Sequence, residues 1–314
     1  MSNRIAITAL AVMVVASTAA PNASAQSKAP LIGRWDLVLD GPGTNKAGWL
    51  EVRHSGRSTL VGNVMISVGS SRPIAKVEFD NGSFKFAVPP QWDDAEGENT
   101  VVGTLKGDSI TGTLTFANGK KVGWRGARAP TLRRASAPSW GAPQPLLNGK
   151  DLSGWKTVAG GANQWLVENG VLRSPKSGSN LMTEKSFTDF KLHVEFRYPA
   201  GSNSGIYLRG RYETQVEDTE SPEPQIDGLG AIYGHIAPNQ NAAKKAGEWQ
   251  TYDITLVGRT VTVVLNGKTV VSEREIPGPT GGALDSNEGA PGPLFLQGDH
   301  GPIEYRNIVI TPAR

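Results

Sequence analysis

The sequence contains no cysteine. This absence excludes disulfide bonds, zinc–thiolate and iron–sulfur sites, a thiol nucleophile and lipoprotein acylation. Histidine is also scarce, with four residues in 314, so few ligands exist for a metal centre built from several histidines. With 32 basic and 29 acidic residues, the net charge is only +3. This balance predicts no nucleic-acid partner.

Long hydrophobic runs are missing except near the N-terminus. Arg4 precedes an apolar run over residues 5–15, and Ala-Ser-Ala at residues 23–25 precedes Gln26. A charged start, an apolar segment and an A-x-A site are typical of a signal peptide over residues 1–25. The alternative is an uncleaved anchor, but the run is shorter than the roughly 18–20 residues of a spanning helix. We expect cleavage near Ala25, a periplasmic or secreted protein, and no membrane span.

Glycine and proline are abundant, with 38 and 21 residues, which indicates many turns. The Asn-Gly pair, whose residues both accept the positive φ of a type I′ hairpin turn, occurs five times, at Asn81-Gly82, Asn118-Gly119, Asn148-Gly149, Asn169-Gly170 and Asn266-Gly267. Short runs between these turns alternate apolar and polar residues, as in residues 190–197. No window shows a helical period, so the sequence predicts an all-β protein.

A segment rich in proline, alanine and arginine over residues 128–145 reads as a linker. It separates a small all-β accessory domain, residues 31–127, from a second domain, residues 146–314. Many short strands favour a small antiparallel β-barrel or sandwich for the first domain, with an interior filled by side chains. The start Gly33-Arg34-Trp35 leaves a ligand-holding barrel as the alternative, and Trp92 could stack on a sugar.

The densest polar segment covers residues 205–218. Read as one strand, it has an apolar face directed to the core and a polar face. The polar face carries Tyr207, Arg209, Arg211, Glu213, Gln215 and Glu217. Guanidinium groups and amides suit the recognition of hydroxyl and carbonyl groups. The alternative is a solvated outer face with cross-strand ion pairs.

The spacing on this strand argues against one familiar mechanism. Glu213 and Glu217 would lie about 13 Å apart along a strand. A hydrolytic carboxylate pair needs roughly 5–5.5 Å or roughly 6.5–9.5 Å, depending on the stereochemical outcome. Any partner of Glu213 must therefore come from another element.

A second polar segment follows the short apolar run over residues 294–296. Asp299 and His300 lie between two glycines, and a carboxylate beside an imidazole can orient the ring and raise its basicity. The alternative is a turn in which Asp299 accepts backbone N–H groups and His300 is incidental. His235 is a lesser candidate, and His193 reads as a surface residue.

Other sites find little support in the sequence. Asp285, Asn287 and Glu288 are spaced like an incomplete calcium loop. No G-x-S-x-G elbow, P-loop, H-E-x-x-H or dinucleotide-binding fingerprint is present.

Several motifs resemble, in order, those of the 3-keto-disaccharide hydrolase family. They cover residues 147–155 (LNGKDLSGW), 203–210 (NSGIYLRG), 212–218 (YETQVED), 230–234 (GAIYG), 247–252 (GEWQTY) and 296–301 (LQGDHG). The resemblance spans about residues 145–312. It implies a concanavalin-like, lectin-like jelly-roll sandwich of two antiparallel sheets for the second domain.

The resemblance also implies cleavage of glycosides that are already oxidised at C3 of the sugar. The C3 carbonyl acidifies the C2 proton, a base removes it, the C1 leaving group departs by elimination, and water addition completes a net hydrolysis. This route needs a general base, an enolate stabiliser and a proton donor. We assign the base to His300, oriented by Asp299, or to Glu213, and the enolate to Arg209 or Arg211.

The expected substrate is a small sugar. Its hydroxyls and rings would be held by Tyr207, Arg211, Gln215, Asp218, Gln297, Trp155 and Tyr233, with Trp249 as another wall. No cofactor is certain, and a divalent cation such as Ca²⁺ could replace the arginine. The alternative is a non-catalytic carbohydrate-binding protein, because the same fold serves lectins. The first domain could bind a partner or a cell-wall glycan, and the oligomeric state stays open.

Overall fold

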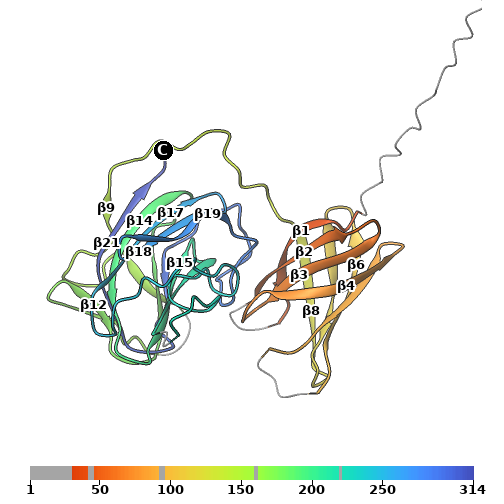
Figure 1. The fold of residues 1–314 in the computed structure, drawn as a ribbon, viewed down its shortest axis with the longest axis horizontal. Coiled ribbons are helices and arrows are strands. Elements are labelled where there is room, and N and C mark those ends of the chain that lie inside the picture. The colour runs from red at the N-terminus through yellow and green to blue at the C-terminus, as the bar shows by residue number, and fades with distance from the viewer. Residues whose placement is uncertain (1–29, 42–45, 92–95, 159–161, 219–220) are drawn as a thin grey trace, which may run out of the picture. The chain divides into compact units, whose positions relative to one another are not determined.

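The computed structural model describes residues 30–41, 46–91, 96–158, 162–218 and 221–314 (Figure 1). The expected signal peptide and Trp92 lie outside these residues. Within them every regular element is a strand, which confirms the all-β prediction. This described part has no helix that is long and apolar enough to cross a membrane.

The first eight strands close into an antiparallel barrel in which each strand pairs with the next along the chain and β1 pairs with β8. They are β1 (Gly33–Leu39), β2 (Ala47–Ser55), β3 (Thr59–Ile66), β4 (Arg72–Asp80), β5 (Ser83–Val88), β6 (Asn99–Lys106), β7 (Ser109–Thr115) and β8 (Lys121–Arg128). Large inward side chains such as Trp35, Phe84 and Trp124 are buried. Gly103 makes room for Phe84 and Trp124, because a Cβ there would overlap both rings. These buried side chains therefore fill part of the barrel interior.

Two antiparallel sheets form the second domain, drawn mainly in green and blue in Figure 1. The five-stranded sheet has the order β10 (Trp155–Val158), β13 (Asn180–Thr183), β20 (Phe295–Leu296), β15 (Asn203–Leu208) and β16 (Tyr212–Glu217). The eight-stranded sheet has the order β11 (Leu166–Glu168), β12 (Val171–Ser174), β21 (Ile303–Pro312), β14 (Phe190–Arg197), β17 (Gln250–Val257), β18 (Thr260–Leu265) and β19 (Lys268–Glu275), with β9 (Gln144–Pro145) paired to β21. This is the expected jelly-roll sandwich, and β9 lies within the segment expected to be a linker.

An apolar core fills the sandwich. One buried cluster joins side chains of both sheets. It includes Ile206 from the smaller sheet and Phe190, Phe196, Tyr252 and Tyr305 from the larger one. Each side chain of this size contributes roughly 1.5–3 kcal/mol when fully buried. The core fixes which face of each strand is left for other chemistry, because successive side chains alternate between faces.

Three of the Asn-Gly pairs form the predicted two-residue hairpin turns, with positive φ at both residues. They join β4 to β5 at Asn81-Gly82, β11 to β12 at Asn169-Gly170 and β18 to β19 at Asn266-Gly267. Asn118-Gly119 lies between β7 and β8 with only the glycine at positive φ, and Asn148-Gly149 joins no hairpin.

The prediction that residues 205–218 form one strand is wrong. The chain reverses after Leu208 through Arg209 and Gly210, which have φ of 55° and 66°, and returns as β16. The alternation survives the turn, because Tyr207 lies opposite Glu213 and Gly205 opposite Gln215. Side chains of directly opposed residues share a face of the sheet. The polar row therefore remains on one face, but the two arginines leave it.

Residues 31–314 form one compact unit, in which the turn after β3 contacts the second domain. The backbone N–H of Gly282 donates to Ser67 O at 3.0 Å, and that of Ser71 donates to Gly234 O at 3.3 Å. On the neighbouring strand β2, the Trp49 indole donates to His235 Nε2 at 3.2 Å. These contacts bring the barrel residues 67–71 beside the loops that follow β16 and β19.

Candidate active site

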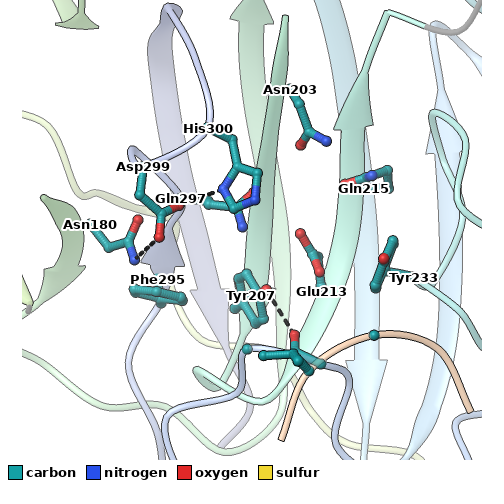
Figure 2. Close-up of a pocket in the computed structure, with 14 residues that line it drawn as sticks. Asn180, Asn203, Tyr207, Glu213, Gln215, Tyr233, Phe295, Gln297, Asp299 and His300 are labelled. Carbon is teal, nitrogen blue, oxygen red and sulfur yellow. Dashed lines mark hydrogen bonds and ion pairs between the residues drawn. The ribbon is translucent and has the colours of Figure 1, made fainter. Parts of the chain in front are cut away.

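A cavity of about 260 Å³ lies on the face of the five-stranded sheet that points away from the sandwich core (Figure 2). Its lining comes from β13, β15, β16, β20 and the loops beside them, together with two barrel residues. The lining residues are Val68, Gly69, Asn180, Asn203, Tyr207, Glu213, Gln215, Tyr233, Gly281, Gly282, Phe295, Gln297, Asp299 and His300. This cavity is slightly smaller than the roughly 300–1,000 Å³ of pockets for drug-sized ligands, which suits a single sugar ring.

Glu213 is the most deeply buried acid of this cavity, with 3 % of its surface exposed. Burial raises the pKa of its carboxyl to about 8, the negative charges of Asp299 and Glu217 add to this, and a hydrogen bond with Tyr207 opposes it. Space for the carboxyl exists because the facing strand has Gly205, where a Cβ would overlap it. Near neutral pH, Glu213 therefore carries a proton and can donate it.

Tyr207 lines the cavity together with Glu213, and its hydroxyl is held by a hydrogen bond of its own. The Tyr207 hydroxyl donates to Gly281 O at 2.9 Å, so its own proton is already used. Burial raises the pKa of Tyr207 well above its ordinary value, which keeps the phenol protonated.

Asp299 and His300 form a hydrogen-bonded pair at the other side of the cavity, with 2.7 Å between His300 Nδ1 and Asp299 Oδ1. Asn180 donates to the second carboxylate oxygen at 3.1 Å and accepts from the Gly298 backbone at 2.7 Å. Burial raises the pKa of Asp299, but the hydrogen bonds from His300 and Asn180 outweigh it and lower that pKa. The aspartate is therefore an ionised group in a fixed orientation.

The same pair sets the protonation of the imidazole. The hydrogen bond to Asp299 raises the pKa of His300 above its ordinary value, although partial burial opposes the shift. With Nδ1–H donating to the carboxylate, Nε2 is the ring atom that remains for a ligand. Figure 2 shows His300 and Glu213 directed toward the same space.

Two amide oxygens of the cavity are buried without a hydrogen-bond partner among the described residues. They are Gln215 Oε1 and Gln297 Oε1. Gln215 donates through Nε2 to Glu217 at 3.3 Å, so only its acceptor is unpaired. Buried acceptors without donors are rare and costly. Hydroxyl groups of a bound sugar would satisfy both.

The structure brings together seven of the predicted site residues in this cavity: Tyr207, Glu213, Gln215, Tyr233, Gln297, Asp299 and His300. It does not bring Arg209 and Arg211 there. Arg209 donates to the Tyr212 hydroxyl at 3.0 Å and to Gly258 O at 2.8 Å. Arg211 donates to Asp285 at 2.7 Å and to Ala290 O at 2.9 Å. Both arginines leave the polar row at the turn after β15, and we withdraw their roles toward the substrate.

Asp218 and Trp155 also lie outside the cavity lining. Asp218 accepts a hydrogen bond from the Gly201 backbone at 2.9 Å. Trp155 belongs to the sandwich core and donates to Leu146 O at 2.7 Å. Both side chains hold loops of the sandwich, so we assign neither to the substrate.

Trp249 is not part of the lining either. Its ring lies against the guanidinium groups of Arg306 and Arg197, whose central carbons are 3.9 and 4.8 Å from the ring centre.

His235, the lesser histidine candidate, accepts a hydrogen bond from the Trp49 indole. Burial lowers the pKa of His235 to about 4, so its imidazole is neutral at neutral pH.

Two of the acidic side chains whose spacing suggested a calcium loop form ion pairs with arginines. Asp285 binds Arg211 at 2.7 Å, and Glu288 binds Arg259 at 2.8 Å. Among the described residues, no three histidine or acidic side chains converge in a way that could hold a metal ion.

Sequence reasoning missed several lining residues. Asn203 opens a motif that was recognised, and Phe295 lies in the apolar run before Gln297, so both had a weak local signal. Asn180 and Val68 had none, because each comes from a part of the chain far from the two polar segments.

Two family models match the chain. That described as "3-keto-alpha-glucoside-1,2-lyase-like domain" matches residues 142–311, and that described as "OAA-family lectin sugar binding domain" matches residues 72–129. No curated protein sequence matches.

Solved structures are similar to slightly more than half of this chain. A protein of Parabacteroides distasonis ATCC 8503, assigned as a glycosyl hydrolase, is 33 % identical over 58 % of this chain and 93 % of its own, with a TM-score of 0.47. Another protein of that organism with the same assignment is 27 % identical over 54 % of this chain and 98 % of its own, with a TM-score of 0.42. The carbohydrate-binding module CBM66 of Bacillus subtilis is 12 % identical over 51 % of this chain and 96 % of its own, with a TM-score of 0.35.

The first family model covers more than half of the chain and contains every cavity residue outside the barrel. The cavity, with its unpaired amide oxygens and its acid and base, suits a protein that acts on or binds glycosides. The chain belongs to the 3-keto-alpha-glucoside-1,2-lyase-like domain family.

Proposed function

We propose that the protein cleaves glycosides oxidised at C3 of the sugar, by removal of the C2 proton and elimination at C1. The observation that carries this proposal is one cavity that holds a protonated, buried carboxyl at Glu213 and an imidazole paired with an ionised carboxylate at His300. A carboxyl that can donate a proton and an imidazole that can accept one, both facing one cavity, are the two groups that general acid–base catalysis needs.

His300 is the base in this mechanism. Its Nε2 accepts the proton from C2, which is acidic because the electron pair left on C2 is delocalised onto the C3 carbonyl oxygen. The imidazolium that forms is stabilised by the Asp299 carboxylate at 2.7 Å. Asp299 is thus a positioning residue, and Asn180 orients it in turn.

Amide groups take the role first assigned to arginine. The side chains of Asn203 and Gln297 line the cavity, and their N–H groups can donate to the developing enolate oxygen. Amide donors stabilise such an oxygen without a cation, provided that the site is dry.

Glu213 is the proton donor in the elimination. As the bond between C1 and the leaving oxygen breaks, that oxygen takes the proton of the carboxyl, and a double bond forms between C1 and C2. When water adds, its oxygen bonds to C1 and its proton goes to Glu213. The His300 imidazolium, whose proton exchanges with solvent once the leaving group has gone, gives a proton to C2. Both residues are then in their starting states, and the net reaction is hydrolysis.

A sugar-binding protein without turnover is the second candidate. It is supported by the two unpaired amide oxygens, which suit sugar hydroxyls whether or not a bond is cleaved. The match of residues 72–129 to a lectin sugar-binding domain supports a glycan-binding role of the barrel. We place either activity outside the cytoplasm, on the pattern of a signal peptide.

The experiment that separates these candidates uses the mature chain, methyl 3-keto-glucoside and the unoxidised methyl glucoside. We expect methanol release from the keto sugar only, and NMR in D₂O should show deuterium at C2 of the product. Binding of the keto sugar without release and without exchange at C2 would leave the binding protein as the answer.

A further inference from the structure

A second cavity of about 390 Å³ opens at one end of the barrel, where β3, β5 and β7 end and β4 and β6 begin. Its wall is largely apolar and includes Val64, Val88, Pro90, Leu114 and Phe116. This composition contrasts with the amides and acids of the sugar-sized cavity. We call this second cavity the barrel mouth.

Val68 connects the two cavities, because it lines both. It is 50 % exposed, and in the described part of the chain only two other large apolar residues are so exposed, Val102 and Ile226. An apolar side chain that reaches solvent between two cavities is available for contact with a ligand that spans them.

The turn that carries Val68 is held from both domains. Ser67 N donates to Ala47 O of the barrel at 2.8 Å, and Gly282 N donates to Ser67 O at 3.0 Å. Ser70 N donates to the Gln91 amide oxygen at 2.9 Å. On the other side, a Cβ at Gly281 would lie 2.6 Å from Gly69, so the glycine permits this close approach. Val68 is thus part of a fixed wall.

We propose that the barrel mouth is the subsite for the leaving group, and that the preferred substrates carry an aromatic aglycone at C1. This inference rests on the proposed function. The polar side chains of the sandwich would hold the sugar ring, and their cavity of about 260 Å³ is smaller than the roughly 300–1,000 Å³ of pockets that enclose drug-sized ligands. The substituent at C1 therefore continues past Val68, where Phe116 and Pro90 offer an apolar surface to a flat ring.

The test compares phenyl and methyl 3-keto-glucosides with the mature full-length chain. For each variant, the ratio of kcat/KM for the phenyl to the methyl substrate is measured, because this ratio cancels effects common to both. We expect Val68→Asp to lower the ratio about tenfold and Phe116→Ala to lower it severalfold. Val102→Asp is the matched control, since Val102 is 46 % exposed and lines neither cavity, and its ratio should stay at the wild-type value.

An unchanged ratio in both Val68→Asp and Phe116→Ala, with melting temperatures near that of the wild type, would overturn the proposal. If the wild type converts neither substrate, the proposed function fails. The proposed subsite is then tested separately, by measuring how tightly the two keto-glucosides bind. Calorimetry would then show tighter binding of the phenyl than of the methyl keto-glucoside, and loss of this difference in Val68→Asp. Equal binding of both sugars to the wild type would refute the subsite.

Discussion

The described part of the chain contains two aspartate–histidine pairs with the same distance between Nδ1 and Oδ1, and one of them lines the candidate active site. His193 on β14 pairs with Asp253 on β17, and His300 pairs with Asp299, each with 2.7 Å between Nδ1 and Oδ1. Exposure does not distinguish them, because the His193 side chain is 39 % exposed and the His300 side chain 52 %. The pair alone is therefore no sign of catalysis.

The nearby carboxyl distinguishes the two regions. Glu213 beside His300 is buried, and its pKa of about 8 keeps it protonated. Near His193 lies Glu195, where burial raises the pKa but hydrogen bonds from Asn307 and Arg306 outweigh it and lower the pKa. A protonated carboxyl can deliver a proton to a leaving group, whereas an ionised one bound to arginine cannot. Burial of one acid thus turns a surface motif into a candidate catalyst.

Removing each imidazole separately should give very different losses of activity. His300→Ala should lower kcat/KM on a 3-keto-glucoside by about 10³-fold, because the base is lost. His193→Ala should leave it within about twofold, as for other surface changes. Steady-state kinetics of both variants measure this difference. Equal losses in the two variants would mean that His300 acts only through stability.

The two carboxyls provide the next test. Glu213→Gln should lower kcat/KM by about 10²-fold, with smaller losses for aglycones that leave without a proton. Its pH profile should also lose the alkaline limb near pH 8, since in the wild type activity falls as Glu213 ionises. Glu195→Gln should keep both the rate and the profile. An alkaline limb that persists in Glu213→Gln would assign that limb to another group.

The aspartates should affect the acidic side of the profile. In the wild type, activity falls as the pH drops through the pKa of His300, which Asp299 raises. Asp299→Asn removes that charge, so the acidic limb should move to lower pH, and kcat/KM at neutral pH should fall about tenfold because the ring loses its orientation. Asp253→Asn should change neither the acidic limb nor kcat/KM at neutral pH. A limb that stays in place in Asp299→Asn would argue against His300 as the base.

Local patterns predicted the parts of the fold and site that depend on neighbouring residues. Alternation placed Tyr207, Glu213 and Gln215 on one face, because the period of a strand is two and a hairpin preserves it. The turn at Arg209 was missed, since it lacks the Asn-Gly pair that marked three other hairpins. Because of this turn, Arg209 and Arg211 lie outside the site, whereas the Glu213 carboxyl lies inside it.

Contacts between distant residues could not be predicted in this way. The pairing of His193 with Asp253 depends on the register of β14 against β17, which no local pattern contains. The same holds for Asn180 at Asp299 and for Val68, which another domain brings to the cavity. The burial that raises the pKa of Glu213 is likewise a sum over remote segments.

The smallest difference should be in stability, where the two pairs should be nearly alike. Asp299 has a lowered pKa in the folded state, so it stabilises the protein above its ordinary pKa, and this stabilisation is lost as the pH falls. Because both pairs are largely solvated, Asp299→Asn and Asp253→Asn should each lower the melting temperature at pH 7 by only about 1–2 °C. For Asp299→Asn the difference from the wild type should vanish in strong acid. Calorimetric scans over pH would measure this. A much larger loss in Asp299→Asn would mean that the Asp299–His300 pair holds the fold together, and the kinetic contrast between the two pairs would then need a structural explanation.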